Sequence, residues 1–153
     1  LNASAKEQCV SLDEILKISK SRALKPIAVN LFRDKDKLCA EKIKSAGITV
    51  ITPKDFKALT KILRVSQFSI SERLHGAIFS IISHTPTYIS ENTDKNKALL
   101  NEITSRTDSE KIIFPYKEND VIAKKEIGAT DSDFNYVIDS LKRDINHALY
   151  EIF

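Results

Sequence analysis

Residues 68–90 read FSISERLHGAIFSIISHTPTYIS, and this stretch decides the fold. It opens with a short apolar run that ends at Ile70 and closes with a second run from Pro86 to Ser90, both of the length typical of buried strands. Between them, five apolar residues recur at spacings i, i+3, i+4, i+7 and i+8, which predicts an amphipathic helix; they are Leu74, Ala77, Ile78, Ile81 and Ile82. A strand, a helix and a strand in this order predict parallel strands joined by a helical crossover.

The same alternation extends in both directions from this stretch. Short apolar runs predict further strands at residues 26–32, 48–51 and 111–114. Amphipathic spacing predicts helices at residues 12–21, 35–46, 53–63 and 93–103, a short helix at 121–128, and a long terminal helix from residue 131. We therefore expect an α/β fold, a Rossmann-like parallel sheet with helices on both faces and right-handed crossovers.

Capping residues mark several of the predicted helix ends. Ser11 and Glu14 have the spacing of a capping box. Gly47 suits the left-handed position that follows a helix. Thr52 stands before a proline, which is typical of an N-cap and a first helical residue, and Asp131 is the predicted cap of the terminal helix.

The length of 153 residues suits one domain. Residues 25–153 are expected to form the Rossmann-like domain with its long terminal helix. Residues 1–24 form a lead-in and a helix, and the sequence leaves open whether they belong to this domain or are the remnant of a missing N-terminal half. Because the chain opens at Leu1 and holds no methionine, we expect a domain excised from a longer protein, or a processed chain.

Composition excludes several classes of function. Three glycines, at positions 47, 76 and 128, cannot build a glycine-rich nucleotide loop. The net charge is only +3 and the lysines are dispersed, so no nucleic-acid partner is expected. No apolar segment approaches the roughly 20 residues of a transmembrane helix, although the full protein could lie close to a membrane surface. Cys9 and Cys39 form no CxxC pair, and reduced thiols of this kind fit a cytoplasmic location.

Ligands of open α/β sheets bind beyond the carboxyl ends of the strands. Three predicted strands run into suitable residues, at positions 33–34, 71–75 and 91–95. In the second of these, Ser71 is placed to cap the following helix, whose N-terminus attracts anions. Arg73 adds a planar cationic fork, and His75 on the first helical turn is available for proton transfer. Spacing alone supports two interpretations equally. The segment is an anion site, or it is a plain helix start in which Arg73 pairs with an acid and His75 packs.

The segment Ser71-Glu72-Arg73-Leu74-His75, its amphipathic helix and the Thr85-Pro86 step resemble the C-terminal half of polysaccharide pyruvyl transferases. Family members show Ser-x-Arg-Leu-His, a helix, a small-Pro step, a strand and then Tyr-Asp-x-Lys. Lys95 takes the place of that lysine, whereas Asn92 and Thr93 stand where tyrosine and aspartate are usual. The first predicted strand, which ends at Arg33, is similar to a family strand that ends in a ligand-facing arginine. The resemblance spans residues 26–103.

The resemblance implies a glycosyltransferase-B-like fold of two Rossmann-like halves, of which this chain is the half that holds phosphoenolpyruvate. It implies a bacterial enzyme of exopolysaccharide biosynthesis that moves a pyruvyl group, as a ketal, onto a glycan or lipid-linked sugar and releases phosphate, with no metal or cofactor. The implied catalytic residue is His75, and the implied substrate-binding residues are Arg33, Ser71, Arg73, Leu74, Asn92 and Lys95. We expect little turnover from this chain alone, because the acceptor wall of the cleft is absent. The oligomeric state stays open.

Two alternatives remain at this stage. A nucleotide-sugar glycosyltransferase domain would need a ribose acceptor such as Glu91. A non-catalytic relative would bind an anionic glycan or a partner protein, and the residues at positions 92 and 93 keep that alternative open. His75 and His84 lie nine positions apart, on opposite sides of a helix, so a shared metal is not expected. His147 is expected on a solvated helix surface.

Overall fold

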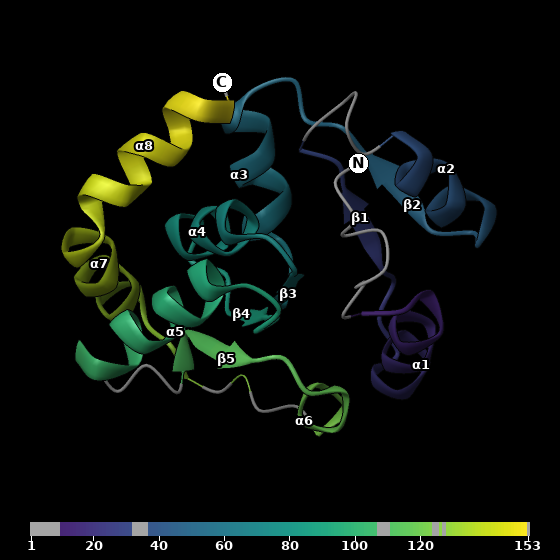
Figure 1. Ribbon diagram of the computed structural model, residues 1–153. Helices are drawn as coiled ribbons and strands as arrows, with labels where there is room; N and C mark the ends of the chain where they lie inside the picture. Colours follow the sequence, from purple (N-terminus) through teal and green to yellow (C-terminus); the bar gives the residue numbers. More distant parts are fainter. Residues whose placement is uncertain (1–9, 32–36, 107–110, 124–125, 127, 153) are drawn as a thin grey trace.

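The computed structural model describes residues 10–31, 37–106, 111–123, 126 and 128–152 (Figure 1). Helices and strands alternate through most of the chain, as the sequence predicts, before three helices close it. The elements, in chain order, are α1 (Leu12–Arg22), β1 (Ile27–Val29), α2 (Lys37–Ser45), β2 (Thr49–Ile51), α3 (Phe56–Arg64), β3 (Ser69–Ser71), α4 (Leu74–Ile82), β4 (Thr87–Ile89), α5 (Asp94–Arg106), β5 (Ile113–Pro115), α6 (Glu118–Ile122), α7 (Asp131–Ser140) and α8 (Lys142–Ile152).

All strand pairs in the described chain are parallel, but they form two sheets rather than the single sheet expected. β1 pairs with β2, and a second sheet has the order β3-β4-β5. In the second sheet Ser71 lies opposite Ile89, and Ile89 lies opposite Pro115, so the three strands end level with one another. The βαβ alternation predicts parallel strands, but it does not specify which strand edges join.

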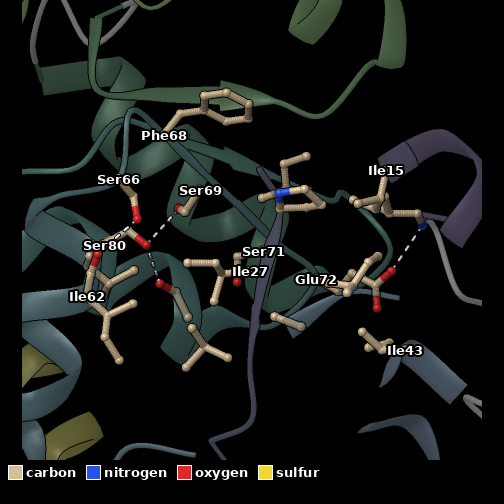
Figure 2. A pocket seen from close by; sticks show the side chains of 18 of the residues that line it. Ile15, Ile27, Ile43, Ile62, Ser66, Phe68, Ser69, Ser71, Glu72 and Ser80 are labelled. Atoms are coloured by element: carbon tan, nitrogen blue, oxygen red, sulfur yellow. Dashed lines mark hydrogen bonds between the residues drawn. The ribbon is translucent and has the colours of Figure 1, made fainter. Parts of the chain in front are cut away.

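A cavity of about 620 Å³ lies between the two sheets and is lined by all three residues of β1 and all three residues of β3. Isoleucines from several elements, among them Ile27 and Ile43, make much of the wall apolar (Figure 2). Ser71 and Glu72 lie at the same cavity, at the carboxyl end of β3. The break between the sheets therefore opens beside the strand ends where the sequence predicts a ligand site.

Helices cover both faces of the three-stranded sheet, which confirms the predicted fold class. Side chains alternate along a strand, and in β4 the neighbours Tyr88 and Ile89, each fully buried, belong to different cores. Ile89 packs with apolar residues of α4, α5 and α7. Tyr88 packs with residues of α1 and α6, including Ile18 and Val121.

A buried ion pair links α1 to Glu126, which follows α6 and contacts the sheet through Tyr88. Arg22, 8% exposed, donates to both carboxylate oxygens of Glu126, over 2.6 and 2.8 Å. Its guanidinium also lies 4.2 Å from the ring centroid of Phe68, and the hydroxyl of Tyr88 donates to Glu126 over 2.7 Å. The arrangement desolvates both charges and pairs each with the other, as a buried pair requires.

Two of the helix caps predicted outside the candidate site need correction. Thr52 does not cap α3; Asp55 does, because its carboxylate accepts the backbone N–H of Ala58 over 2.7 Å. The terminal helix is capped by Thr130 rather than by Asp131, and it divides at Leu141 into α7 and α8. Thr130 takes the N-cap position because its side chain and that of Asp133 form a reciprocal capping box.

Other predicted ends are confirmed. Ser11 and Glu14 form the capping box of α1, with hydrogen bonds of 3.1 and 2.7 Å. Gly47, after α2, has a φ of +81°, and α4 spans the predicted apolar positions from Leu74 to Ile82. In the part of the chain that the structure describes, no helix combines the length and the apolar character that crossing a bilayer requires.

Candidate active site

The carboxyl ends of β3, β4 and β5 lie at one edge of the sheet, because the strands are parallel and in register. The ladder continues one residue past β4 and β5: Ser90 N–H donates to Ser71 C=O over 3.0 Å, and Tyr116 N–H donates to Ile89 C=O over 2.9 Å. Glu72 follows β3 directly at this edge. The turn that leads into α4 therefore starts where ligands of such sheets bind.

Ser71 does not cap α4, contrary to the prediction. β3 extends through Ser71, so the N-cap position falls on Arg73, which has extended backbone angles and makes no side-chain cap bond. The hydroxyl of Ser71 instead donates to the carbonyl of Arg73 over 2.6 Å. As a result, no side chain of the N-cap residue occupies the backbone N–H groups of the first turn of α4, and this turn keeps its partial positive charge.

Gly76 allows Ser71 to approach the first turn of α4 closely. A Cβ atom on Gly76 would lie 2.3 Å from the Ser71 hydroxyl oxygen, a distance that side chains do not tolerate. A side chain at position 76 would therefore force the Ser71 hydroxyl to rotate away and give up its hydrogen bond to the Arg73 carbonyl. Ser71 acts here as a structural residue of the turn and is 8% exposed.

The structure brings the predicted motif residues Arg73, Leu74 and His75 together at the β3–α4 junction. Arg73 is exposed, and His75 lies half-buried on the first turn of α4. Leu74 packs against the main apolar core and anchors the turn. Their arrangement offers a cationic fork, a helix N-terminus and an imidazole within one turn of chain, which suits an anion that must exchange a proton.

Glu72 is a site residue that sequence reasoning missed. Its carboxylate accepts the backbone N–H of Val10 over 3.0 Å, and its side chain is half-buried at the cavity (Figure 2). Burial raises the pKa of Glu72, although the Val10 hydrogen bond and the charge of Arg73 act in the opposite direction. The signal available in the sequence was its place between a strand and the Arg-Leu-His segment.

Tyr116, after β5, is a second titratable group at this edge that the sequence did not single out. Burial, with the negative charges of Glu14 and Glu118, raises the pKa of Tyr116 to about 12. Its phenol therefore stays protonated at neutral pH. The edge thus combines the Arg73 cation with the Glu72 carboxylate and the Tyr116 phenol.

The third predicted segment follows β4. Thr93 caps α5, with its hydroxyl 3.2 Å from the N–H of Asn96. The side-chain oxygen of Asn92 accepts a hydrogen bond from Asn96 Nδ2 over 3.1 Å. Lys95 is exposed on the first turn of α5. The two residues that depart from the family pattern, Asn92 and Thr93, are thus both engaged at the start of this helix.

Arg33 lies outside the described residues, so the structure does not place it. β1, the strand that precedes it, lines the same cavity as Ser71, Glu72 and Arg73. His84 lies two residues beyond α4; its ring nitrogen is 2.5 Å from Asp131, and its ring stacks on Phe134. Among the described residues, no three His, Cys, Asp or Glu side chains gather as a metal site would require.

The fold and the site define a class, an α/β domain with a cationic helix start at the carboxyl edge of parallel strands, suited to a small anionic ligand. A comparison with known families matches residues 3–94 to the polysaccharide pyruvyl transferases. Because the match covers more than half of the chain, the protein belongs to this family. The match includes Arg33 and the Ser71–His75 segment, and it ends one residue before Lys95. No curated protein matches, and no solved structure matches.

Proposed function

We propose that this chain binds phosphoenolpyruvate and acts in the transfer of its pyruvyl group to a sugar of a surface polysaccharide precursor. The observation that supports this most is the β3–α4 junction, where Arg73, His75 and the start of α4 converge within the family-matched segment. Family membership supports transferase chemistry, and the site chemistry supports a small anionic donor. We propose that the reaction takes place in the cytoplasm of a bacterium, on a glycan or lipid-linked acceptor.

Phosphoenolpyruvate carries two anionic groups, a carboxylate and a phosphate, and therefore needs two cationic clamps. Arg73 with the N-terminus of α4 supplies one of them, since guanidinium forks and helix starts both bind such oxyanions. Arg33 and Lys95 are the candidates for the second clamp. Leu74 would contribute its backbone position rather than its packed side chain.

The reaction needs protons to move in two directions. A proton adds to the methylene carbon of the donor, and an acceptor hydroxyl adds to the neighbouring carbon. A second hydroxyl then displaces phosphate from that carbon to complete the ketal. The two hydroxyls release two protons, which balance the one gained by carbon and the one taken up by the phosphate. His75 is the group we assign to proton transfer, because it lies on the first turn of α4 beside the proposed anion site.

Calorimetric titration of phosphoenolpyruvate into the protein tests the binding step. Arg73→Ala is expected to weaken binding by about tenfold or more, the loss of one charge-assisted hydrogen bond. Arg143→Ala removes the same charge from an exposed position on α8 and should leave the affinity unchanged. Tighter binding of a sugar nucleotide than of phosphoenolpyruvate would instead favour a glycosyltransferase.

A turnover assay on the full-length protein tests the chemical step separately. His75→Gln is expected to lower phosphate release by about 10²–10⁴-fold, the usual contribution of a general acid or base, while donor binding persists. Donor binding by the unaltered protein without any turnover on a range of glycan acceptors would identify a non-catalytic relative instead.

A further inference from the structure

Asn96 connects three segments at the carboxyl edge of the sheet. It is 1% exposed, and its side-chain nitrogen lies 2.9 Å from the carbonyl oxygen of Glu72, 2.7 Å from that of Ser90 and 3.1 Å from Oδ1 of Asn92. These three oxygens belong to the β3–α4 turn and to the loop between β4 and α5. One buried amide therefore joins the two loops that hold the candidate ligand-binding residues.

We propose that Asn96 is a positioning residue that sets the separation between the β3–α4 turn and the start of α5, and so the spacing of Arg73 and Lys95, two of the cations proposed to hold the donor. Arg73 directly follows Glu72, whose carbonyl Asn96 holds, and Lys95 directly precedes Asn96. Arg73 and Lys95 are thus each the chain neighbour of a residue that makes this hydrogen bond. The inference rests on the proposed function for the identity of the ligand, but not for the link itself.

The chemistry of the three partners explains why an asparagine stands here. Two are backbone carbonyls and the third is an amide oxygen, so all three are acceptors. A buried acceptor that loses its donor costs free energy, because no water replaces the bond. A carboxylate at this position could only accept, and an apolar side chain could do neither.

The position of Asn96 on α5 fixes the direction of its side chain. Its own N–H is held by the Thr93 hydroxyl, 3.2 Å away, so the first turn of α5 is already capped. The side chain then reaches back across the strand ends to Glu72, 24 residues earlier in the chain. Because the helix start is held independently, losing the amide should release the β3–α4 turn without melting α5.

The expected consequence is selective for ligands that need both cations. Inorganic phosphate can be held by one clamp, whereas phosphoenolpyruvate offers a carboxylate and a phosphate that would span two. Loosening the link should therefore weaken phosphoenolpyruvate binding much more than phosphate binding. A general loss of stability would not distinguish between the two ligands.

Asn96→Asp is the test variant, because it keeps the shape and replaces the donor by an acceptor. Asn101→Asp is the control, since it makes the same charge change at an exposed position on the same helix. We expect Asn96→Asp to weaken phosphoenolpyruvate binding by about tenfold, the loss of one hydrogen bond, and inorganic phosphate binding by less than about twofold. Amide hydrogen exchange without ligand should speed up at residues 72–75 and 90–92 in this variant only.

Equal loss of affinity for both ligands, or exchange rates at residues 72–75 that match the Asn101→Asp control, would overturn the inference. Asn96→Ser, which keeps one neutral donor, replaces the aspartate variant if the latter does not fold. Unfolding of both variants would assign Asn96 to the stability of the whole domain and would also overturn it. If the unaltered protein binds neither ligand, the proposed function fails, and faster exchange at the two loops still supports the positioning link.

Discussion

At the scale of single residues, the Ser71 hydroxyl leaves no room for a side chain at Gly76 unless Ser71 moves. We expect Gly76→Ala to lower the free energy of unfolding by about 1–3 kcal/mol, because its Cβ would fall 2.3 Å from the Ser71 hydroxyl oxygen. Adding Ser71→Ala removes that oxygen and leaves the nearest Ser71 atom at 3.4 Å, so the double variant should recover most of the loss. Urea denaturation measures both. A single alanine variant as stable as the unaltered protein would contradict the packing argument.

Glu72 gives the site a pH dependence of defined sign. Burial raises its pKa in the folded state, so the folded protein binds the proton more tightly than the unfolded chain does. Glu72 therefore favours the folded state most at low pH, and this contribution decreases as pH rises above the ordinary glutamate pKa.

Glu72→Gln should flatten that decrease in the pH dependence of unfolding, measured by urea denaturation across the acid range. Glu41→Gln, an exposed change of the same kind on α2, should keep the slope of the unaltered protein. Asp133 acts with the opposite sign, because hydrogen bonds from Thr130 lower its pKa and its contribution decreases as pH falls. A slope unaffected by Glu72→Gln would contradict the assignment.

The residues of the candidate site differ in how far sequence could predict them. Arg73, Leu74 and His75 are neighbours in the chain, so their proximity follows from one strand-to-helix turn. Asn96 gives no local signal, since its role depends on a carbonyl 24 residues earlier. The contact of Glu72 with Val10 likewise depends on two segments 62 residues apart, which no spacing within residues 68–90 specifies.

At the scale of elements, α1 is held by the ion pair of Arg22 with Glu126. Arg22→Leu is expected to lower the free energy of unfolding by about 3–5 kcal/mol, because it leaves the buried Glu126 carboxylate without its cation. Lys20→Leu, an exposed change on the same helix, should cost far less. Chemical denaturation measures the difference, and hydrogen exchange should show α1 loosened first. Equal effects of the two changes would show that the pair contributes nothing to holding α1.

Helix α4 was predictable because its apolar residues follow the helical period without interruption. The start of α3 was not, because Thr52 and Asp55 are both good capping residues and lie within one turn of each other. Pro53 is buried, the chain bends at residues 54 and 55, and the helix begins at Phe56 with Asp55 as its cap. Local pattern predicts that a helix exists more firmly than it predicts where the helix begins.

At the scale of the whole molecule, the parallel α/β class follows from the alternation of strands and helices, whereas the division into two sheets does not. Pairing of strand edges depends on contacts between distant segments, and short apolar runs carry no information about them. The division matters for function, because the cavity that it leaves is bordered by β1, the strand before Arg33, and by the Ser71–Arg73 turn. A donor that engages both would contact both sheets.

The most direct test of the central claim, that the β3–α4 junction binds phosphoenolpyruvate, is a titration followed by backbone amide NMR. The account predicts saturable amide chemical-shift changes that cluster at residues 71–77 and 92–96 and disappear in Arg73→Ala. The amide signals of α7 and α8 should stay unchanged. A folded protein whose amides at residues 71–77 do not move at millimolar phosphoenolpyruvate, or which shift equally in Arg73→Ala, would contradict it.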